Sequence, residues 1–289
     1  MYKLIAIDLD GTLFNSYGEI SEENRKAIKY ALNEGVEVVL ASGREPRTME
    51  KISLDLGIKN FLISGNGASV YSIKDKKNIF ESYIDKENVL GIIDLCKNNS
   101  IFLNIYTNIG IIAEAFNYNV KVFNNENNYK PKDKQTNIEI VKDLNEYIKN
   151  TELQILKIII CDESKIIFDN IMQKLKKIKG IEVLEIEHMS KKIIKVGTDE
   201  ETIEYYYTEI TNKNTNKWDA LEFIMNKLSI EREDVICIGD NFNDEKMIIN
   251  AGVGVVMKES ALALKKIGDY ITNSNDEDGV KDAICKYIK

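Results

Sequence analysis

The most constraining feature of this chain is a buried-strand pattern that ends in two acidic residues. The apolar run at residues 4–7 is followed at once by Asp8, Leu9, Asp10, Gly11 and Thr12. Four consecutive apolar residues with a glycine just beyond them are typical of a parallel strand that is buried on both faces. Asp8 and Asp10 stand two positions apart, so their side chains point to the same side of the strand end. Ligands of open α/β sheets bind beyond the carboxyl ends of the strands, so we expect a site here.

Two carboxylates at one strand end repel each other unless a cation lies between them. Mg²⁺ is a hard cation that prefers oxygen ligands, so the pair predicts a magnesium site. The alternative is that these residues form only a turn or a helix N-cap, since Asp-Gly pairs are common in turns.

Two further strand-like runs end in polar residues of the same kind. Residues 36–40 lead into Ser42, Gly43 and Arg44, and residues 235–238 lead into the segment Gly-Asp-Asn-Phe-Asn-Asp at 239–244. Lys217 opens an amphipathic helix predicted over residues 217–228. Because the carboxyl ends of parallel strands share one edge of a sheet, we expect these segments to meet near Asp8.

The order of the predicted elements indicates an α/β fold with a doubly wound parallel sheet and an inserted α+β domain. Strands and helices alternate over the first 70 residues and again after residue 215, which is typical of a parallel sheet. The region between has runs of strands with segregated helices, which favours a separate α+β domain. We therefore predict a core domain at 1–83 and 211–289 and an insertion at 84–210.

Three local features of the insertion give further predictions. The asparagine-rich residues 124–128 indicate an exposed loop, with a mobile specificity loop as the alternative. In the run Tyr205-Tyr206-Tyr207, strand alternation sends Tyr206 to the face opposite its neighbours, so at least one of the rings packs in the interior. The only histidine, His188, lies far from the motifs in a polar stretch and is expected on the surface.

Composition narrows the possible partners. The net charge of −8 and the pI of about 5.1 give no general basic field that would attract nucleic acid. The chain has no apolar run of about 18 residues, and the first strand begins near residue 1, so we expect no membrane span and no signal peptide. A cytoplasmic location is the expectation that follows.

Together these segments resemble the four motifs of the haloacid dehalogenase (HAD) superfamily, which are D-x-D-G-T, S/T-G-R, a lysine and G-D-x-x-N-D. The run Ser64-Gly65-Asn66-Gly67-Ala68 and the pattern Lys217-x-x-Ala220-Leu221 narrow the resemblance to the Cof-like sugar phosphatases. These proteins have a HAD core of Rossmann-like topology and a large α/β cap of the C2 type between the second and third motifs. The resemblance covers the whole chain in motif order and is closest in the core.

The resemblance implies a role for each residue of the motifs. Asp8 would be the nucleophile, and Asp10 the general acid and base. Asp8, Asp10 (through its backbone carbonyl) and Asp240 would hold Mg²⁺, with Asp244 orienting Lys217 or the outer shell of the metal. The phosphoryl group would be bound by Leu9, Thr12, Ser42, Gly43, Lys217 and Asn243. Asn66, Gly67 and Arg44 would lie on the leaving-group side, or else shape a turn and form an ion pair. We expect replacement of Lys217 to change stability little, as at an exposed site.

The implied function is a Mg²⁺-dependent phosphatase that hydrolyses small phosphomonoesters, with sugar phosphates as the expected class, through an aspartyl-phosphate. Its expected partner is a small phosphorylated metabolite, and its expected state a monomer or weak homo-oligomer, without nucleic acid or membrane. The alternatives are a phosphomutase and a non-catalytic regulator that binds a phosphorylated metabolite. A nicotinamide-binding protein is disfavoured, since no G-x-G-x-x-G follows the first strand.

Overall fold

The chain forms two compact units, and each is described by itself. The computed structural model describes residues 2–44, 46–107, 109–132, 135–184, 189–197, 199–213 and 215–289, with only the backbone of Arg47. The first unit comprises Met1–Glu81 and Thr215–Lys289, and the second is Ser82–Asn214. The prediction for His188 lies outside the described residues.

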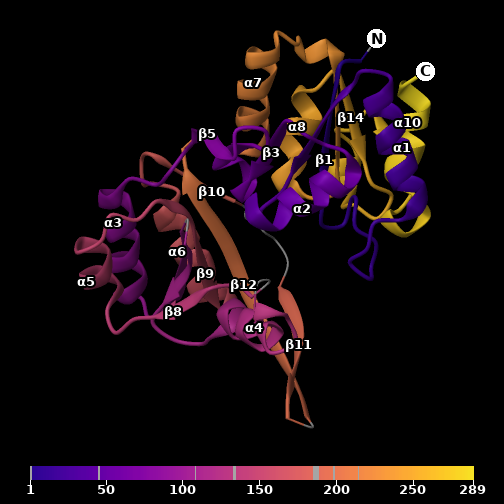
Figure 1. Cartoon of the computed structure of the whole chain (residues 1–289). Helices are drawn as coiled ribbons and strands as arrows, with labels where there is room; N and C mark the ends of the chain where they lie inside the picture. The colour runs from indigo at the N-terminus through magenta and orange to yellow at the C-terminus, as the bar shows by residue number, and fades with distance from the viewer. Residues whose placement is uncertain are drawn as a thin grey trace. The chain divides into compact units, whose positions relative to one another are not determined.

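The first unit is built on an eight-stranded sheet in the order β15-β14-β13-β1-β2-β3-β4-β5 (Figure 1). The six strands from β15 to β3 are parallel, and β4 and β5 add an antiparallel hairpin at one edge. In chain order the strands are β1 (Leu4–Asp8), β2 (Glu37–Ala41), β3 (Phe61–Ser64), β4 (Ser69–Ser72), β5 (Lys77–Glu81), β13 (Val235–Gly239), β14 (Val253–Val256) and β15 (Tyr270–Ile271). The parallel part confirms the predicted fold class, and the hairpin was not predicted.

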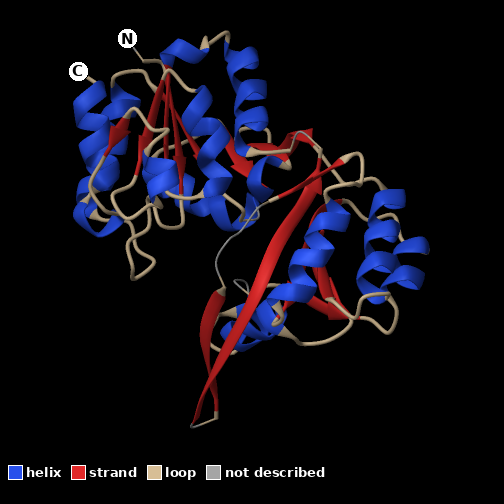
Figure 2. Ribbon diagram, turned by 180° about the vertical axis from the view of Figure 1, so that it is seen from behind, coloured by secondary structure: helices blue, strands red, loops and turns tan. Residues whose placement is uncertain are grey.

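Helices cover both faces of this sheet (Figure 2). Successive side chains of a strand point to opposite faces, so each buried strand packs against helices on both sides. Ile5 and Ile7 of β1 pack with α1, α2 and α10, whereas Leu4 and Ala6 pack with α7 and α8. The helices of this unit are α1 (Glu22–Asn33), α2 (Pro46–Leu56), α7 (Lys217–Leu228), α8 (Glu245–Asn250), α9 (Leu262–Lys265) and α10 (Gly279–Tyr287). Short 3₁₀ turns are η1 (Gly65–Gly67), η3 (Arg232–Asp234), η4 (Phe242–Asp244) and η5 (Asn275–Glu277).

The pairing of β1 with β13 positions the predicted motifs. These neighbouring strands run parallel, with Ile7 in register with Ile238, so their carboxyl ends lie side by side. Asp8 is the last residue of β1, and Asp240 follows directly after β13. On the other side of β1, Asp8 is in register with Ala41 of β2, just before Ser42. Three of the predicted motifs therefore meet at the carboxyl ends of β1, β2 and β13.

The second unit is an α+β domain, as predicted. Its sheet has the order β10-β12-β9-β6-β7-β8, and β11 pairs with β12. The strands are β6 (Phe102–Thr107), β7 (Gly110–Ala113), β8 (Ile138–Ile140), β9 (Ile155–Asp162), β10 (Ile181–Val183), β11 (Ser190–Val196) and β12 (Asp199–Asn212). Its helices are α3 (Lys86–Lys97), α4 (Tyr118–Asn127), α5 (Leu144–Lys149) and α6 (Lys165–Leu175). One hydrophobic cluster joins α3, α5 and α6 to the sheet, and other clusters join α4 to the opposite face.

Two local predictions for this unit have different outcomes. Tyr206 packs with Phe168 among the residues of α6, whereas Tyr205 and Tyr207 pack in the cluster that includes Val122 of α4, which confirms the predicted alternation. The predicted loop at residues 124–128 is wrong, because α4 continues to Asn127. Its buried residues Val120 and Val122 pack on the sheet, and this burial outweighs the low helix propensity of the asparagines.

No helix in the described part of the chain combines the length and the hydropathy that crossing a lipid bilayer requires.

Candidate active site

The centre of the site is a buried lysine held between two carboxylates. The Nζ atom of Lys217 lies 2.5 Å from Oδ1 of Asp8 and 2.6 Å from Oδ1 of Asp244. The Lys217 side chain is fully buried, and Asp8 is 4% exposed. The expectation that Lys217 behaves as an exposed residue is therefore wrong. A buried ammonium is stable only if such partners replace the water that it has lost.

Lys217 reaches this position because of how its helix begins. Asn216 is the N-cap of α7, and its side-chain oxygen accepts hydrogen bonds from the backbone N–H groups of Trp218 and Asp219. An asparagine directly before an amphipathic sequence pattern is a typical N-cap, so this helix start could be predicted from the sequence. The turn η1 packs against the same point, because a Cβ atom on Gly67 would lie only 2.1 Å from the carbonyl oxygen of Asn216. Only glycine permits so close an approach.

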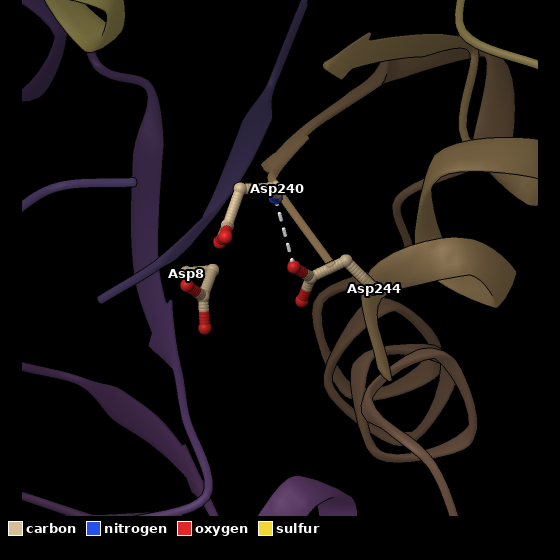
Figure 3. Close-up of side chains that lie close together, drawn as sticks. All are labelled: Asp8, Asp240 and Asp244. Atoms are coloured by element: carbon tan, nitrogen blue, oxygen red, sulfur yellow. Dashed lines mark hydrogen bonds between the residues drawn. The ribbon is translucent and has the colours of Figure 1, made fainter. Parts of the chain in front are cut away.

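Asp240 and Asp244 are both fixed by hydrogen bonds, but in different ways. The Thr12 hydroxyl donates to Oδ1 of Asp240 at 2.9 Å. The backbone N–H groups of Asp240 and Asn241 donate to Oδ2 of Asp244 at 3.0 and 3.1 Å, the first of which is drawn in Figure 3. Both oxygens of Asp244 are therefore engaged, one by this turn and the other by Lys217. The structure places the Thr12 hydroxyl on Asp240, and the predicted binding of the phosphoryl group by Thr12 stays a prediction.

Burial, together with the charge of neighbouring carboxylates, raises the pKa values of Asp8 and Asp240. Burial raises the pKa of Asp8 well above its usual value, Lys217 lowers it, and the nearby Asp244 and Asp240 carboxylates raise it further. Burial and the charge of Asp244 raise the pKa of Asp240 to about 6. Burial alone would lower the pKa of Lys217, but the charges of Asp244 and Asp8 raise it above its usual value, so Lys217 stays protonated. These raised pKa values are what a buried cluster shows when it has three carboxyl groups and only one cation.

This donor set fits a hard divalent cation. Ligand oxygens of Asp8, Asp240 and Asp244 all lie within 4.8 Å of one another, and Figure 3 shows the three side chains converging. Three carboxylates and one ammonium leave a formal charge of −2, which a divalent cation would neutralise. Carboxylate oxygens are the ligands that Mg²⁺ prefers. Because Asp244 is already engaged through both oxygens, Asp8 and Asp240 are the residues with oxygens to spare.

The carboxylate of Asp10 lies outside this cluster and pairs with Arg44. The Nε and Nη2 atoms of Arg44 donate to the two oxygens of Asp10 at 2.9 and 2.6 Å. The guanidinium carbon of Arg44 also lies 4.8 Å from the ring centroid of Phe14. The side chain of Asp10 is 58% exposed, unlike that of Asp8. The sequence left two alternatives for Arg44, a place on the leaving-group side or an ion pair. The structure shows the ion pair, with Asp10.

Of the remaining predicted residues, Ser42, Asn243, Asn66 and Leu9 have contacts that the structure describes. Ser42 is buried after β2, and its Oγ atom accepts a hydrogen bond from the backbone N–H of Arg44. Asn243 donates through Nδ2 to Oδ1 of Asn66 at 3.1 Å. Leu9 is fully buried in the hydrophobic core, so only its backbone can take part in the site. The sequence did not predict the contact between Asn66 and Asn243.

Comparisons with known proteins agree with this architecture. The chain is 30% identical over 288 residues to the 5-amino-6-(5-phospho-D-ribitylamino)uracil phosphatase YcsE of Bacillus subtilis, which covers 99% of this chain and 96% of the relative. It is 29% identical to Phosphatase YwpJ of the same organism, over 96% of this chain and 97% of the relative. A solved haloacid dehalogenase-like hydrolase from Bacteroides thetaiotaomicron superposes with a TM-score of 0.77 at 28% identity, over 99% of both chains. The model of one family matches residues 5–284, and the chain therefore belongs to the haloacid dehalogenase-like hydrolases and is an enzyme.

Proposed function

We propose that this hydrolase is a Mg²⁺-dependent phosphatase that cleaves small phosphomonoesters through a phosphoryl group carried on Asp8. The observation that carries the proposal is the buried Lys217 between Asp8 and Asp244, close to Asp240, which directly follows β13. The relatives are named as phosphatases, and YcsE acts, by its name, on the phosphate ester of a ribityl chain. The name of YcsE supports a sugar-phosphate class of substrate for this chain.

Asp8 has the position and the partner that a nucleophile needs. Its carboxylate would attack phosphorus, and the bond to the leaving oxygen would break as the phosphoryl group passes to Asp8. The ammonium of Lys217 holds one oxygen of Asp8 and offsets the charge of an arriving phosphate. A bound Mg²⁺, held by Asp8 and Asp240, would supply the further positive charge that phosphoryl transfer requires.

Asp10 is proposed to handle the protons of the reaction. It would protonate the leaving oxygen in the first step and accept a proton from water when the phosphoryl-aspartate is hydrolysed. Its exposure suits this role, because the leaving group and water reach the site from solvent. The two-pronged contact from Arg44 fixes the plane of the Asp10 carboxyl group, as bidentate arginine pairs do.

Replacing Arg44 by methionine tests this assignment of Asp10. The pair is exposed, so we expect stability to change by less than about 1 kcal/mol. We expect kcat/KM for an alkyl phosphate to fall about tenfold or more. Asp10 remains but loses the partner that fixes its orientation, and a well-positioned general acid typically contributes about 10²–10⁴-fold. The fall should be much smaller for p-nitrophenyl phosphate, because nitrophenolate leaves readily without a proton. Steady-state rates on both esters measure the difference.

Arg232 provides the control for this variant. It is an exposed arginine paired with an adjacent carboxylate, Glu233, and it lies in η3 just before β13 begins, at the opposite end of that strand from Asp240. Arg232→Met should leave both rates unchanged. Equal losses on the two esters in Arg44→Met would contradict a role in leaving-group protonation and would indicate that Arg44 binds the phosphate itself.

Mg²⁺ dependence is the second prediction of the proposal. EDTA should abolish turnover and Mg²⁺ restore it, whereas Ca²⁺ should inhibit, because its looser and higher coordination disturbs the geometry of transfer. Mg²⁺ should also raise the unfolding temperature, since a cation that binds only the folded state stabilises it by about 2.7 kcal/mol at a hundredfold excess over Kd. Asp240→Asn should lose this thermal shift. Full activity after exhaustive chelation would contradict the proposal.

The second unit is proposed to act as the cap that selects substrates. It is an insertion between Glu81 and Thr215 of the catalytic unit, with its own hydrophobic core. We assign to it the exclusion of bulk water and of macromolecules from the reaction, as closing domains do in other enzymes.

The cytoplasmic location and the monomeric or weakly oligomeric state stay predictions from the sequence.

A panel of phosphomonoesters tests the proposed function directly. Released phosphate is measured with Mg²⁺ for sugar phosphates, a sugar-alcohol phosphate, p-nitrophenyl phosphate and a phosphorylated protein. We expect turnover of the small esters and none of the phosphorylated protein. An isomerised sugar phosphate without free phosphate would instead indicate a phosphomutase. Binding without any product would indicate a non-catalytic regulator.

A further inference from the structure

The turn η1 joins three parts of the candidate site that are far apart in the sequence. The backbone N–H of Asn66 donates to the carbonyl oxygen of Ser42 at 3.0 Å. A Cβ atom on Gly43 would lie 3.1 Å from the amide of Asn66, so the segment after β2 packs tightly on that side chain. Gly67 abuts the N-cap of the helix that carries Lys217. The turn is therefore in contact with the segments that supply three predicted phosphate-binding residues, Ser42, Gly43 and Lys217.

The third contact runs through the side chain of Asn66. Its Oδ1 atom accepts the hydrogen bond from Nδ2 of Asn243 at 3.1 Å. The Oδ1 atom of Asn243 is buried and has no hydrogen-bond partner among the described residues. A primary amide offers two donor hydrogens and two acceptor sites, so Asn66 takes only one of the bonds that Asn243 can make. The second N–H of Asn243 is thus available, while its plane is fixed by Asn66.

The backbone of Asn66 has a conformation that favours glycine. Its φ angle is +55°, inside the left-handed region, where glycine is the residue with least strain. Asparagine tolerates this conformation better than most other residues, but a side chain there is still a cost. The two flanking residues of the turn are both glycine. The asparagine between them supplies the amide that contacts Asn243.

We propose that Asn66 is a positioning residue that holds the Asn243 amide for the phosphoryl group. This inference rests on the proposed function, in which Asn243 donates to a phosphoryl oxygen. Asn66 acts through Asn243 and does not itself touch the substrate. Without it the Asn243 side chain would rotate among its rotamers, and binding a phosphate would have to order it again.

Asn66→Gly is the variant that tests the proposal. Glycine accepts the φ angle of this position, so the backbone of the turn is kept and only the amide is removed. We expect the Kd for inorganic phosphate, measured by calorimetry with Mg²⁺, to rise roughly three- to tenfold, the range that one neutral hydrogen bond supports. The KM for a small ester should rise by a similar factor, with a smaller change in kcat.

Lys76→Gly is the matched control. Lys76 also has a left-handed φ angle, +52°, and lies in the exposed turn between β4 and β5 of the same unit. It therefore repeats the backbone change without touching the site. We expect Lys76→Gly to bind phosphate as the parent protein does, and both glycine variants to unfold within a few degrees of the parent, as expected for compatible positions.

A double-mutant cycle with Asn243→Ala decides whether Asn66 acts through Asn243. The proposal requires that Asn66→Gly weakens phosphate binding in the parent but has no further effect, within about twofold, once Asn243 is alanine. Equal losses in both backgrounds would overturn it, as would parent-like binding by Asn66→Gly. The failure of the proposed function looks different, because the parent protein itself would then neither bind phosphate nor hydrolyse an ester.

Discussion

Asp8→Asn should reduce turnover at least about a hundredfold, because the amide has the shape of the carboxylate but cannot attack phosphorus. The fold should survive. Since folding raises the pKa of Asp8, its ionised form is less favourable in the native state than in the unfolded chain, and at neutral pH this costs stability. The neutral amide removes that cost, while Lys217 keeps Asp244 as a partner.

The measurements for this variant are initial rates with Mg²⁺ and thermal unfolding in EDTA. We expect the unfolding temperature of Asp8→Asn to equal or exceed that of the parent protein under metal-free conditions. An intact fold with parent-like turnover would remove Asp8 from the mechanism. A large drop in unfolding temperature would mean that the ion pair with Lys217 outweighs the crowding of the carboxylates.

Lys217→Met should impair both catalysis and folding. The structure reverses the expectation of a neutral effect on stability, because the ammonium is buried between Asp8 and Asp244. Removing one partner of a buried ion pair typically costs about 3–5 kcal/mol, since a charge is left without compensation. Turnover should also fall about a hundredfold or more, because the cation beside the transferring group is lost.

The stability effect has a built-in control. In the Asp8→Asn background, Lys217→Met leaves one fewer buried carboxylate without a partner, so it should lower the unfolding temperature less than in the parent protein. Lys217→Arg should restore stability only in part, because a broad guanidinium does not fit where a compact ammonium sits. A methionine variant that unfolds like the parent, measured in EDTA, would contradict the buried charge network.

The sequence predicted the fold wherever local patterns were sufficient. The apolar runs that became β1 and β13 are continuous, so their burial in a parallel sheet could be read directly. The hairpin of β4 and β5 was missed, because the residues of β5 are only partly buried and show no strong alternation. Helix α4 was missed because its asparagines favour loops when only the local sequence is considered.

The sequence predicted which residues form the site but not how they contact one another. Asp8, Asp240 and Asp244 were expected near each other because their segments follow predicted parallel strands, whose carboxyl ends lie together, and the structure brings their carboxyl groups together. Lys217 begins its helix where Gly67 closely approaches Asn216, and this is a contact between distant parts of the chain. The bond between Asn66 and Asn243 spans 177 positions, and no periodicity or spacing connects them. Such contacts follow from tertiary packing alone.

The central claim is that the phosphoryl group passes through Asp8. The most direct test is to mix the enzyme with Mg²⁺ and a rapidly reacting ester, quench in acid within one turnover, and map the modified peptide by tandem mass spectrometry. The account predicts one added phosphoryl group on Asp8, and none on the same peptide from Asp8→Asn. A phosphoryl group on another residue, or turnover with an unmodified Asp8 at every quench time, would contradict it.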